Sequence, residues 1–211
     1  SNTTDMSRMF YKCRSLNYLN ISNFNVQKVT NMSYMFQECL SLSTIDVSSF
    51  NAPALTTMTY MFYNCQSLNN LVLPLNMNTT SLTDISYAFA ACYAMTHFDM
   101  RPFVVNKVTT MRNLFTDDRG AIEIDLSSWV LNTDSTVYAY YMFNNCANLT
   151  TVYVSEKWNY TRLSATGGYG LFLNCRKLVG ANGVKWNADR AYQWARYDHA
   201  SQGYFSAKAT K

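Results

Sequence analysis

The chain has 211 residues, of which 48% are hydrophobic, and this is enough apolar surface to form a buried core. Charged residues make up only 14%, well below the roughly 25% of ordinary soluble domains, so the surface must be largely neutral and polar. No run of about 20 apolar residues occurs, which excludes a membrane-spanning helix. The chain opens at Ser1 without an initiator Met or signal peptide, so we expect a fragment or a processed form.

Residues 30–47 form the unit from which the rest of the chain is built. Apolar residues at offsets of 0, +3, +4 and +7 predict one face of a short helix, and they are Met32, Met35, Phe36 and Cys39. The alternation in Ile45-Asp46-Val47 predicts a short strand. A unit with one helical segment, one turn and one strand cannot bury its own apolar side, and it is stable only when it stacks on copies of itself.

Copies of this unit follow one another along the chain. The Phe-x-x-Cys element occurs as Phe10/Cys13, Phe36/Cys39, Phe62/Cys65, Phe89/Cys92, Phe143/Cys146 and Phe172/Cys175. A seventh copy has Phe115, with Asp118 at the cysteine position. The spacing is 26 to 29 residues. We therefore predict an α/β solenoid of about seven repeats, with a parallel β-sheet on one face and short helices on the other.

The helical segments are expected to begin after pairs of capping residues, at Thr30-Asn31, Thr56-Thr57, Thr83-Asp84 and Thr109-Thr110. The six cysteines share one repeat position, which predicts a column of small, buried, free thiols. A disulfide is possible only between adjacent repeats. No Cys-x-x-Cys occurs, and His97 and His199 lie at unrelated positions, so we predict no metal site. A buried Asp118 would be costly, and we expect the chain to loop outward there, with Gly120 turning it.

The repeat array is predicted to span residues 1–175, and residues 176–211 are predicted to form a C-terminal cap. Within the cap we expect a short helix over 188–196 and an edge strand over 203–206. The array holds 10 Lys/Arg and 11 Asp/Glu, a net of −1, whereas the cap holds 7 and 2, a net of +5. A nucleic-acid binder would carry a basic stripe along its repeats, so nucleic acid is excluded as a partner. The basic cap is either a solvated terminus or a contact for an anionic partner or membrane surface. The first repeat has no comparable cover, which predicts more chain upstream.

The motif Asn-Met-Ser-x-Met-Phe-x-x-Cys-x-x-Leu-x-x-Ile-Asp-Val-Ser at residues 31–48 resembles the repeat of BspA-type leucine-rich-repeat surface proteins, found in Treponema, Bacteroides and some mucosal protozoa. The tail, with Leu178-Val179-Gly180 and Gly203-Tyr204-Phe205, is similar to the end of such arrays. The resemblance implies a right-handed leucine-rich-repeat solenoid at the cell surface or secreted from a host-associated bacterium. It implies adhesion to a host extracellular-matrix or neighbouring-cell protein, and no catalysis.

The residues between the buried positions of each strand should face outward and form a docking surface. Stacking places Asp99 beside Asp125, and like charges on neighbouring strands need a cation, an Arg such as Arg101, or a basic ligand nearby. The alternative is that each Asp caps the turn after its own strand, next to Ser48 or Ser127. The candidate partner-binding residues are Tyr18, Asp46, His97, Asp99, Arg101, Glu123, Asp125 and Tyr153.

An enzyme is disfavoured because the carboxylates Glu123 and Asp125 lie on a flat strand face, with no phosphate loop and no Ser/His/Asp set. We predict no catalytic residue and no cofactor. The sequence leaves two functions open. The leading one is a non-catalytic protein-binding or adhesion module that uses the exposed strand face. The alternative is a passive spacer that presents another domain of a longer protein.

Overall fold

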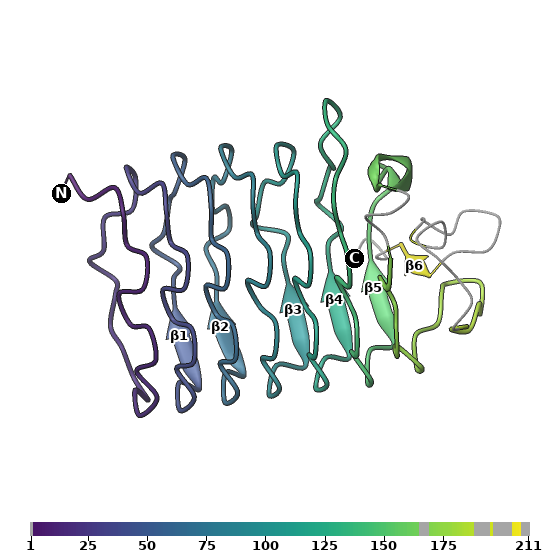
Figure 1. The fold of residues 1–211 in the computed structure, drawn as a ribbon, viewed down its shortest axis with the longest axis horizontal. Helices are drawn as coiled ribbons and strands as arrows, with labels where there is room; N and C mark the ends of the chain where they lie inside the picture. Colours follow the sequence, from purple (N-terminus) through teal and green to yellow (C-terminus); the bar gives the residue numbers. More distant parts are fainter. Residues whose placement is uncertain (1, 165–168, 188–194, 196–203, 208–211) are drawn as a thin grey trace.

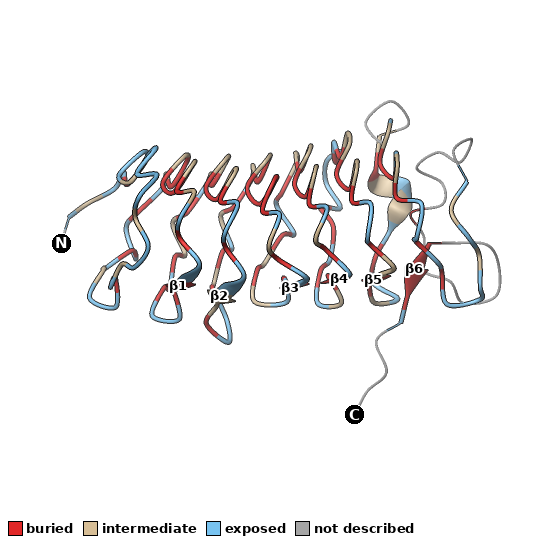
Figure 2. Cartoon of the chain, turned by 90° about the horizontal axis from the view of Figure 1, so that it is seen from below, coloured by how far each residue is buried: buried red, intermediate tan, exposed pale blue. Residues whose placement is uncertain are grey.

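In the computed structural model the chain winds into successive coils that stack side by side from the N-terminus to the C-terminus (Figure 1). The structure describes residues 2–164, 169–187, 195 and 204–207. Each regular coil contains a segment of tight turns, one short strand and a return segment. Buried and exposed residues alternate along each coil, and many of the exposed ones lie on the loops that join its segments (Figure 2).

The strands are only two or three residues long and all their pairings are parallel. They are β1 (Thr44–Asp46), β2 (Asn70–Val72), β3 (His97–Asp99), β4 (Glu123–Asp125), β5 (Thr151–Tyr153) and β6 (Phe205–Ser206). Two sheets result, one in the order β1-β2 and the other in the order β3-β4-β5-β6. On the far side of the coils, isolated parallel bridges join successive coils through Asp5, Asn31, Thr57, Asp84, Thr110 and Tyr138. The predicted parallel sheet on one face is therefore present.

The predicted short helices are wrong. Within the described ranges the one helical element is the 3-10 turn η1 (Tyr160–Arg162), and no helix there is long and apolar enough to cross a bilayer. The segment from Met32 to Cys39 is instead two consecutive turns. In the first, Met35 N–H donates to Met32 O at 3.3 Å, and in the second, Cys39 N–H donates to Phe36 O at 3.1 Å.

The backbone between these bonds explains why no helix forms. Tyr34 and Glu38 have φ of 62° and 57°, the positive values that the third residue of a type II turn adopts. The N–H groups of Tyr34 and Phe36 donate to the next coil, at Thr59 O (2.9 Å) and Met61 O (2.8 Å). Because every second N–H bonds to a neighbouring coil, the i→i−4 bonds of a helix cannot close.

The predicted capping residues lie at the starts of these turns and not at helix starts. Asn31 Oδ1 accepts from Ser33 N–H at 2.9 Å, and Asp84 Oδ1 accepts from Ser86 N–H at 2.9 Å. The threonines act as donors, since the Thr56 hydroxyl donates to Thr30 O in the preceding coil at 2.9 Å. The side chains therefore satisfy turn and inter-coil groups.

Seven phenylalanines form a continuous stacked column through the core. Neighbouring ring centroids lie 5.2 to 6.0 Å apart with interplanar angles of 1° to 14°. The column consists of Phe10, Phe36, Phe62, Phe89, Phe115, Phe143 and Phe172. Offset stacking at this spacing adds to the burial of each ring, so the column is the main apolar contact between coils.

The cysteines form a second column beside the first. Each buried thiol donates to the carbonyl of the phenylalanine one coil earlier, as Cys65 does to Phe36 O at 3.1 Å and Cys175 to Phe143 O at 2.8 Å. All six cysteines are free, and the predicted buried column is confirmed for five of them. Burial raises the pKa of Cys39 to about 12, so its thiol stays protonated and keeps donating. Cys13 is exposed because no other coil of this chain covers the first one.

Asp118 does not loop outward, contrary to expectation. It is fully buried in the cysteine column, and its Oδ1 accepts from Cys92 N–H at 2.7 Å while its Oδ2 has no hydrogen-bond partner. Burial raises the pKa of this carboxyl well above its ordinary value. Gly120 contributes close packing, because a Cβ there would lie 2.1 Å from Tyr93 O. The backbone thus keeps its usual path, and the carboxyl replaces a thiol.

The described part of residues 176–211 closes the stack. Trp186 Nε1 donates to Phe172 O at 2.7 Å, so the indole ends the row of phenylalanine carbonyls that the thiols bond in the earlier coils. The predicted edge strand is confirmed as β6, which pairs with β5 at the end of the sheet. Phe205 packs edge-on against Trp158 and Phe172. The helix predicted over 188–196 lies outside the described residues, apart from Ala195.

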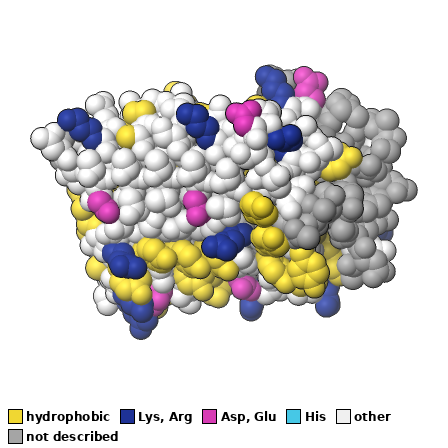
Figure 3. Space-filling view, turned by 45° about the horizontal axis from the view of Figure 1, so that its top comes forward, with side chains coloured by type: hydrophobic (Ala, Val, Ile, Leu, Met, Phe, Trp, Pro, Cys, Tyr) yellow, Lys and Arg dark blue, Asp and Glu magenta, His cyan; other side chains and the backbone are white. Residues whose placement is uncertain are grey.

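The surface agrees with the low charge of the sequence. One face of the molecule is mostly backbone and neutral polar side chains, with scattered lysines, arginines and acidic residues (Figure 3). Contacts with other molecules on this face must therefore depend on hydrogen bonds and local apolar patches more than on a broad charged area.

Candidate binding site at the interrupted strand face

The strand face brings together six of the eight predicted site residues. The register pairs His97 with Glu123 and Asp99 with Asp125, as the repeat phase predicted. In the next pairing Asp125 lies beside Tyr153. Arg101 follows β3 directly, whereas Asp46 lies on β1, on the far side of β2, and Tyr18 belongs to the first coil and is 73% exposed.

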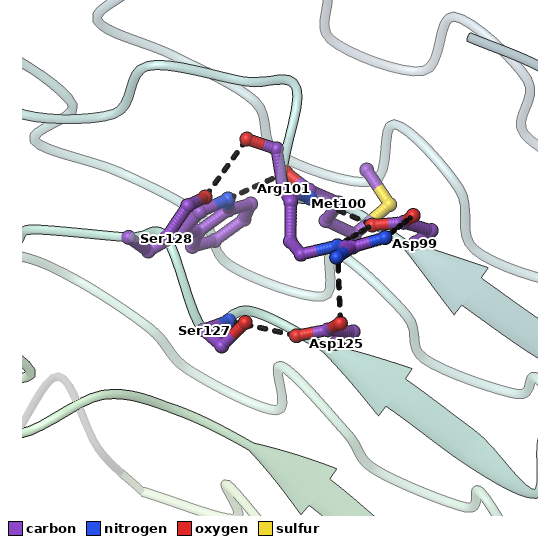
Figure 4. A network of polar contacts seen from close by, with 7 residues as sticks. Asp99, Met100, Arg101, Asp125, Ser127 and Ser128 are labelled. Atoms are coloured by element: carbon purple, nitrogen blue, oxygen red, sulfur yellow. Dashed lines mark hydrogen bonds and ion pairs between the residues drawn. The ribbon is translucent and has the colours of Figure 1, made fainter. Parts of the chain in front are cut away.

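Arg101 links the two aspartates of neighbouring strands (Figure 4). Its Nη2 lies 2.5 Å from Asp99 Oδ2 and its Nε lies 3.2 Å from Asp125 Oδ2. The hydrogen bonds that the guanidinium donates to Asp99 raise the pKa of Arg101 above its ordinary value. Asp125 was expected to face outward, but only 3% of its side chain is exposed, because the arginine lies over it. Arg101 thus supplies the positive charge that the adjacent carboxylates require.

Each of these aspartates also holds the turn after its own strand. Asp46 Oδ1 accepts from Ser48 N–H at 2.8 Å, and Asp125 Oδ1 accepts from Ser127 N–H at 2.9 Å. Asp99 accepts from the N–H of Arg101 at 3.2 Å. The hydrogen bonds from Ser48 lower the pKa of Asp46. The turn-capping geometry is therefore present, and a role of these carboxylates toward a partner stays a prediction.

The third coil lacks this turn, and the sheet breaks beside it. Val72 stands at the aspartate position and has no acceptor, while Pro74, two residues on, has no N–H to donate. No backbone hydrogen bond joins β2 to β3 in the described ranges. Pro74 was expected to face outward and is buried instead, and Leu75 is fully exposed.

The break is confined to the strand side of the coils. On the turn side, Tyr60 N–H still donates to Ser86 O at 3.0 Å and Phe62 N–H to Ala88 O at 2.8 Å. The far-side bridge between Thr57 and Asp84 also persists. The third and fourth coils therefore stay stacked while their strands separate.

The separation leaves a cleft of about 480 Å³. Leu71 and Leu73 are only partly buried there, in contrast to the fully buried Ile45 and Val47 of the second coil. The lining consists of Asn69, Asn70, Leu71, Leu73, Pro74, Leu75, Met95, His97, Phe98, Asp99, Met100, Arg101 and Pro102. Three predicted site residues therefore line it. The cleft itself was missed, although Val72 and Pro74 were a visible signal for it.

The cleft combines strand edges, apolar side chains and one ion pair. Its walls are two strand edges, its floor is aliphatic, and its charged groups are already paired with each other. In the part of the chain that the structure describes, no group of three or more His, Cys, Asp or Glu side chains is placed to hold a metal ion. The arrangement suits contact with a polypeptide more than chemistry on a small substrate.

Comparisons with known proteins identify a family and little beyond it. No curated protein matches the chain. A leucine-rich-repeat protein from Bacteroides ovatus, solved by crystallography, is 13% identical and covers 84% of this chain and 70% of its own, with a TM-score of 0.26. A similarity this low carries no argument, so the resemblance to BspA-type proteins stays a prediction. The family model described as "Mycoplasma protein of unknown function, DUF285" matches residues 1–98 and 83–203. Because these two matches span nearly the whole sequence, the chain belongs to that family.

Proposed function

We propose that the chain is a non-catalytic protein-binding module, built as a right-handed leucine-rich-repeat solenoid, that receives an extended segment of a partner protein at the cleft between β2 and β3. The observation that carries this proposal is the break in the parallel sheet. Elsewhere in the described coils each strand pairs with the next one, from β1 to β2 and from β3 through to β6. Within the described coils, this is the one place where two neighbouring strands face each other without pairing.

An extended polypeptide has the backbone groups that such edges lack. The edges of β2 and β3 that face each other have no partner strand. An incoming segment in β conformation offers N–H and C=O groups at the matching spacing, as in β-strand addition. Backbone bonds of this kind give affinity without requiring one sequence, and side-chain pockets give the selectivity.

The side chains around the cleft indicate which segments fit. Leu71, Leu73 and Leu75 offer aliphatic contacts, and Leu75 is fully exposed in the unbound chain. The strand positions around the cleft carry more acidic than basic side chains. The acidic ones are Asp46, Asp99, Glu123 and Asp125, and the basic one is Arg101. A segment with an aliphatic anchor flanked by Lys or Arg therefore complements the site best.

The experiment is a selection from a displayed library of unstructured peptides on the immobilised chain, followed by biolayer interferometry on single peptides. We expect saturable binding that Leu75→Ser weakens several-fold, because a buried aliphatic contact is lost. Tyr138→Ala is the control, since Tyr138 is an exposed side chain at the far-side bridge with Thr110, away from the cleft. Equal binding by both variants would show that the peptides dock elsewhere.

The alternative function is a passive spacer. Two results together would support it: the selected peptides do not bind saturably, and a longer protein that contains this array binds a host matrix or neighbouring-cell protein while the array alone does not. A location at the cell surface or outside the cell is also part of the proposal. Protease treatment of intact cells, with loss of the protein followed by antibody, tests that location.

A further inference from the structure

A second column of aromatic rings runs along the turn side, on the half-exposed surface. Tyr34, Tyr60 and Tyr87 stack with centroid distances of 5.1 and 4.4 Å and interplanar angles of 7°. The guanidinium of Arg8 lies 5.0 Å from the Tyr34 ring and covers that end. Burial within this stack raises the pKa of Tyr60 to about 12. The rings therefore form a partly desolvated ladder with one residue for each coil.

The ladder is interrupted at the fifth coil, where Asn113 occupies the tyrosine position. All positions of the series share the same left-handed backbone, with φ of 58° at Tyr87, 53° at Asn113 and 54° at Tyr141. Tyr141 does not close the gap, because its ring lies over Gly170, where an added Cβ would come within 2.4 Å of it. The face of Tyr87 that points away from Tyr60 is thus left without a stacked ring in the described coils.

The gap is an open depression above a continuous backbone. Below it the coils remain joined, since Tyr87 N–H donates to Arg112 O at 3.0 Å and Asn113 N–H donates to Tyr140 O at 2.7 Å. The open space measures about 440 Å³. It is lined by Tyr87, Arg112, Asn113, Tyr140, Tyr141 and Asn144. The tyrosine rings stack at a spacing of one coil up to Tyr87, and no ring occupies the next position, at Asn113. The space there fits one ring.

The lining distinguishes between kinds of ring. The lining contains two carboxamides, a guanidinium and two tyrosines besides Tyr87. The Asn144 amide already donates to Thr116 Oγ1 at 3.1 Å. The Asn113 side chain makes no hydrogen bond within the described coils, so its amide is available to a ligand. A purely aromatic ligand would desolvate these polar groups without replacing their hydrogen bonds, which is costly. A pyranose ring has a C–H face that complements the negative face of a tyrosine ring, and hydroxyls around its rim that bond with amides and guanidinium.

We propose that the slot between Tyr87 and Tyr141 is a carbohydrate-binding site that takes one hexopyranose ring of a glycan. The ring stacks on Tyr87, and its hydroxyls contact Asn113, Asn144 and Arg112. The site lies on the turn side, away from the β2–β3 cleft, so a glycan and an extended peptide would occupy the molecule independently.

Saturation-transfer NMR with the methyl glycosides of glucose, galactose and N-acetylglucosamine tests this proposal. We expect transfer to at least one sugar, with a dissociation constant on the order of millimolar for so small and open a contact. Asn113→Tyr is the decisive variant, because it fills the slot with the ring that other coils carry at the same backbone conformation. It should abolish transfer and leave the far-UV circular dichroism unchanged.

Two further variants separate binding from folding. Asn113→Ala keeps the slot open and removes the amide, so it should weaken transfer without abolishing it; Ala91, at φ 61°, shows that alanine is tolerated at such a backbone. Tyr34→Ala removes a ring from the far end of the same ladder and should leave transfer unchanged. Absence of transfer to all three sugars, or equal transfer by wild type and Asn113→Tyr, would overturn the proposal. Transfer confined to an aromatic probe such as indole would overturn it in favour of a site for aromatic rings.

Discussion

The turn side and the strand side of the coils behave differently, although every coil contributes to both. On the turn side the column of phenylalanine rings runs without a break from Phe10 to Phe172. On the strand side the sheet is divided between β2 and β3. The strand side therefore contains an interruption that the phenylalanine column does not show.

The contrast indicates which contacts hold neighbouring coils together. Each step on the turn side combines a stacked ring, inter-coil backbone bonds and, in most coils, a thiol hydrogen bond. Each strand pairing is a ladder of only two or three residues, and an aspartate holds the turn after β1, β3 and β4. Because the turn side keeps the third and fourth coils stacked where the strands separate, the strand side is free to vary. Four measurements can test this division.

The largest expected effect is the loss of a ring from the phenylalanine column. Phe62→Ala should lower the free energy of unfolding by about 3–5 kcal/mol, because it removes a fully buried ring stacked on both sides. Leu71→Ala, in the half-buried floor of the cleft, should lower it by less than about half as much. Guanidinium denaturation followed by circular dichroism measures both. Equal losses would show that the two sides contribute alike.

The second effect concerns Asp118, where the turn side holds a carboxyl in place of a thiol. Asp118→Asn keeps an acceptor for Cys92 N–H and removes the buried acid, so it should raise stability at pH 8 by about 1–3 kcal/mol. Folding raises the pKa of Asp118. The contribution of this carboxyl to folding stability is therefore fully present below its pKa in the unfolded chain, about 3.9, and is lost as pH rises toward its pKa in the folded chain.

The stability of the wild-type chain should therefore fall between pH 5 and 8, and that of Asp118→Asn should stay nearly level. Above about pH 5 the carboxyls with lowered pKa values, Asp5, Asp46 and Glu38, are ionised in both states and contribute no slope. Asp134→Asn, on an exposed loop, is the control. A level wild-type profile would mean that Asp118 is not held neutral.

A smaller effect is expected from the arginine on the strand side. Arg101→Gln leaves Asp125 buried without its cation and should cost about 1–2 kcal/mol, a value reduced because half of the Arg101 side chain is exposed. Arg119→Gln breaks the more exposed pair with Asp117 and should cost under about 1 kcal/mol. Thermal denaturation at low and high salt compares them. A larger loss of stability for Arg119→Gln than for Arg101→Gln would show that the buried pair of Arg101 with Asp125 is not the stronger one.

The smallest change in stability should come from mending the sheet. Val72→Asp combined with Pro74→Ser supplies the acceptor and the donor of the missing turn, and we expect a shift of under about 1 kcal/mol. Amide hydrogen exchange should show new protection at position 74, and peptides selected on the cleft should bind less tightly. Unchanged binding with clear new protection would separate the cleft from partner recognition.

The repeat phase was readable from the sequence, but the conformation inside each repeat was not. The Phe-x-x-Cys spacing predicted the cysteine column, and the repeat phase predicted the pairing of Asp99 with Asp125, whereas the stacked phenylalanine column was not foreseen. The same apolar offsets suit a helix and a pair of tight turns equally. The choice depends on positive φ at residues such as Tyr34 and Glu38, which seldom adopt it. Bonds to neighbouring coils impose it, and no local propensity reveals them.

The candidate site was predictable to a similar extent. That the acidic residues gather on one strand face follows from phase, whereas the burial of Asp125 follows from the direction of the Arg101 side chain. The break between β2 and β3 lies beside Val72 and Pro74, which lack both partners of the turn that follows β1, β3 and β4. Asn113 in the tyrosine series is the same kind of signal, a single departure from an otherwise repeated position.

The hydrogen bond from Trp186 to Phe172 O bears on how long such an array can be. In the coils that carry a buried cysteine, the thiol donates to the phenylalanine carbonyl of the preceding coil. The last coil therefore presents a phenylalanine carbonyl that no later thiol bonds, whatever the number of coils before it. The bond from the Trp186 indole to this carbonyl does not depend on the number of preceding coils. Inserting one more copy of residues 31–56 ahead of the terminus should therefore give a longer rod with an intact end, and gene duplication could lengthen the molecule in whole steps without any new solution for its tip.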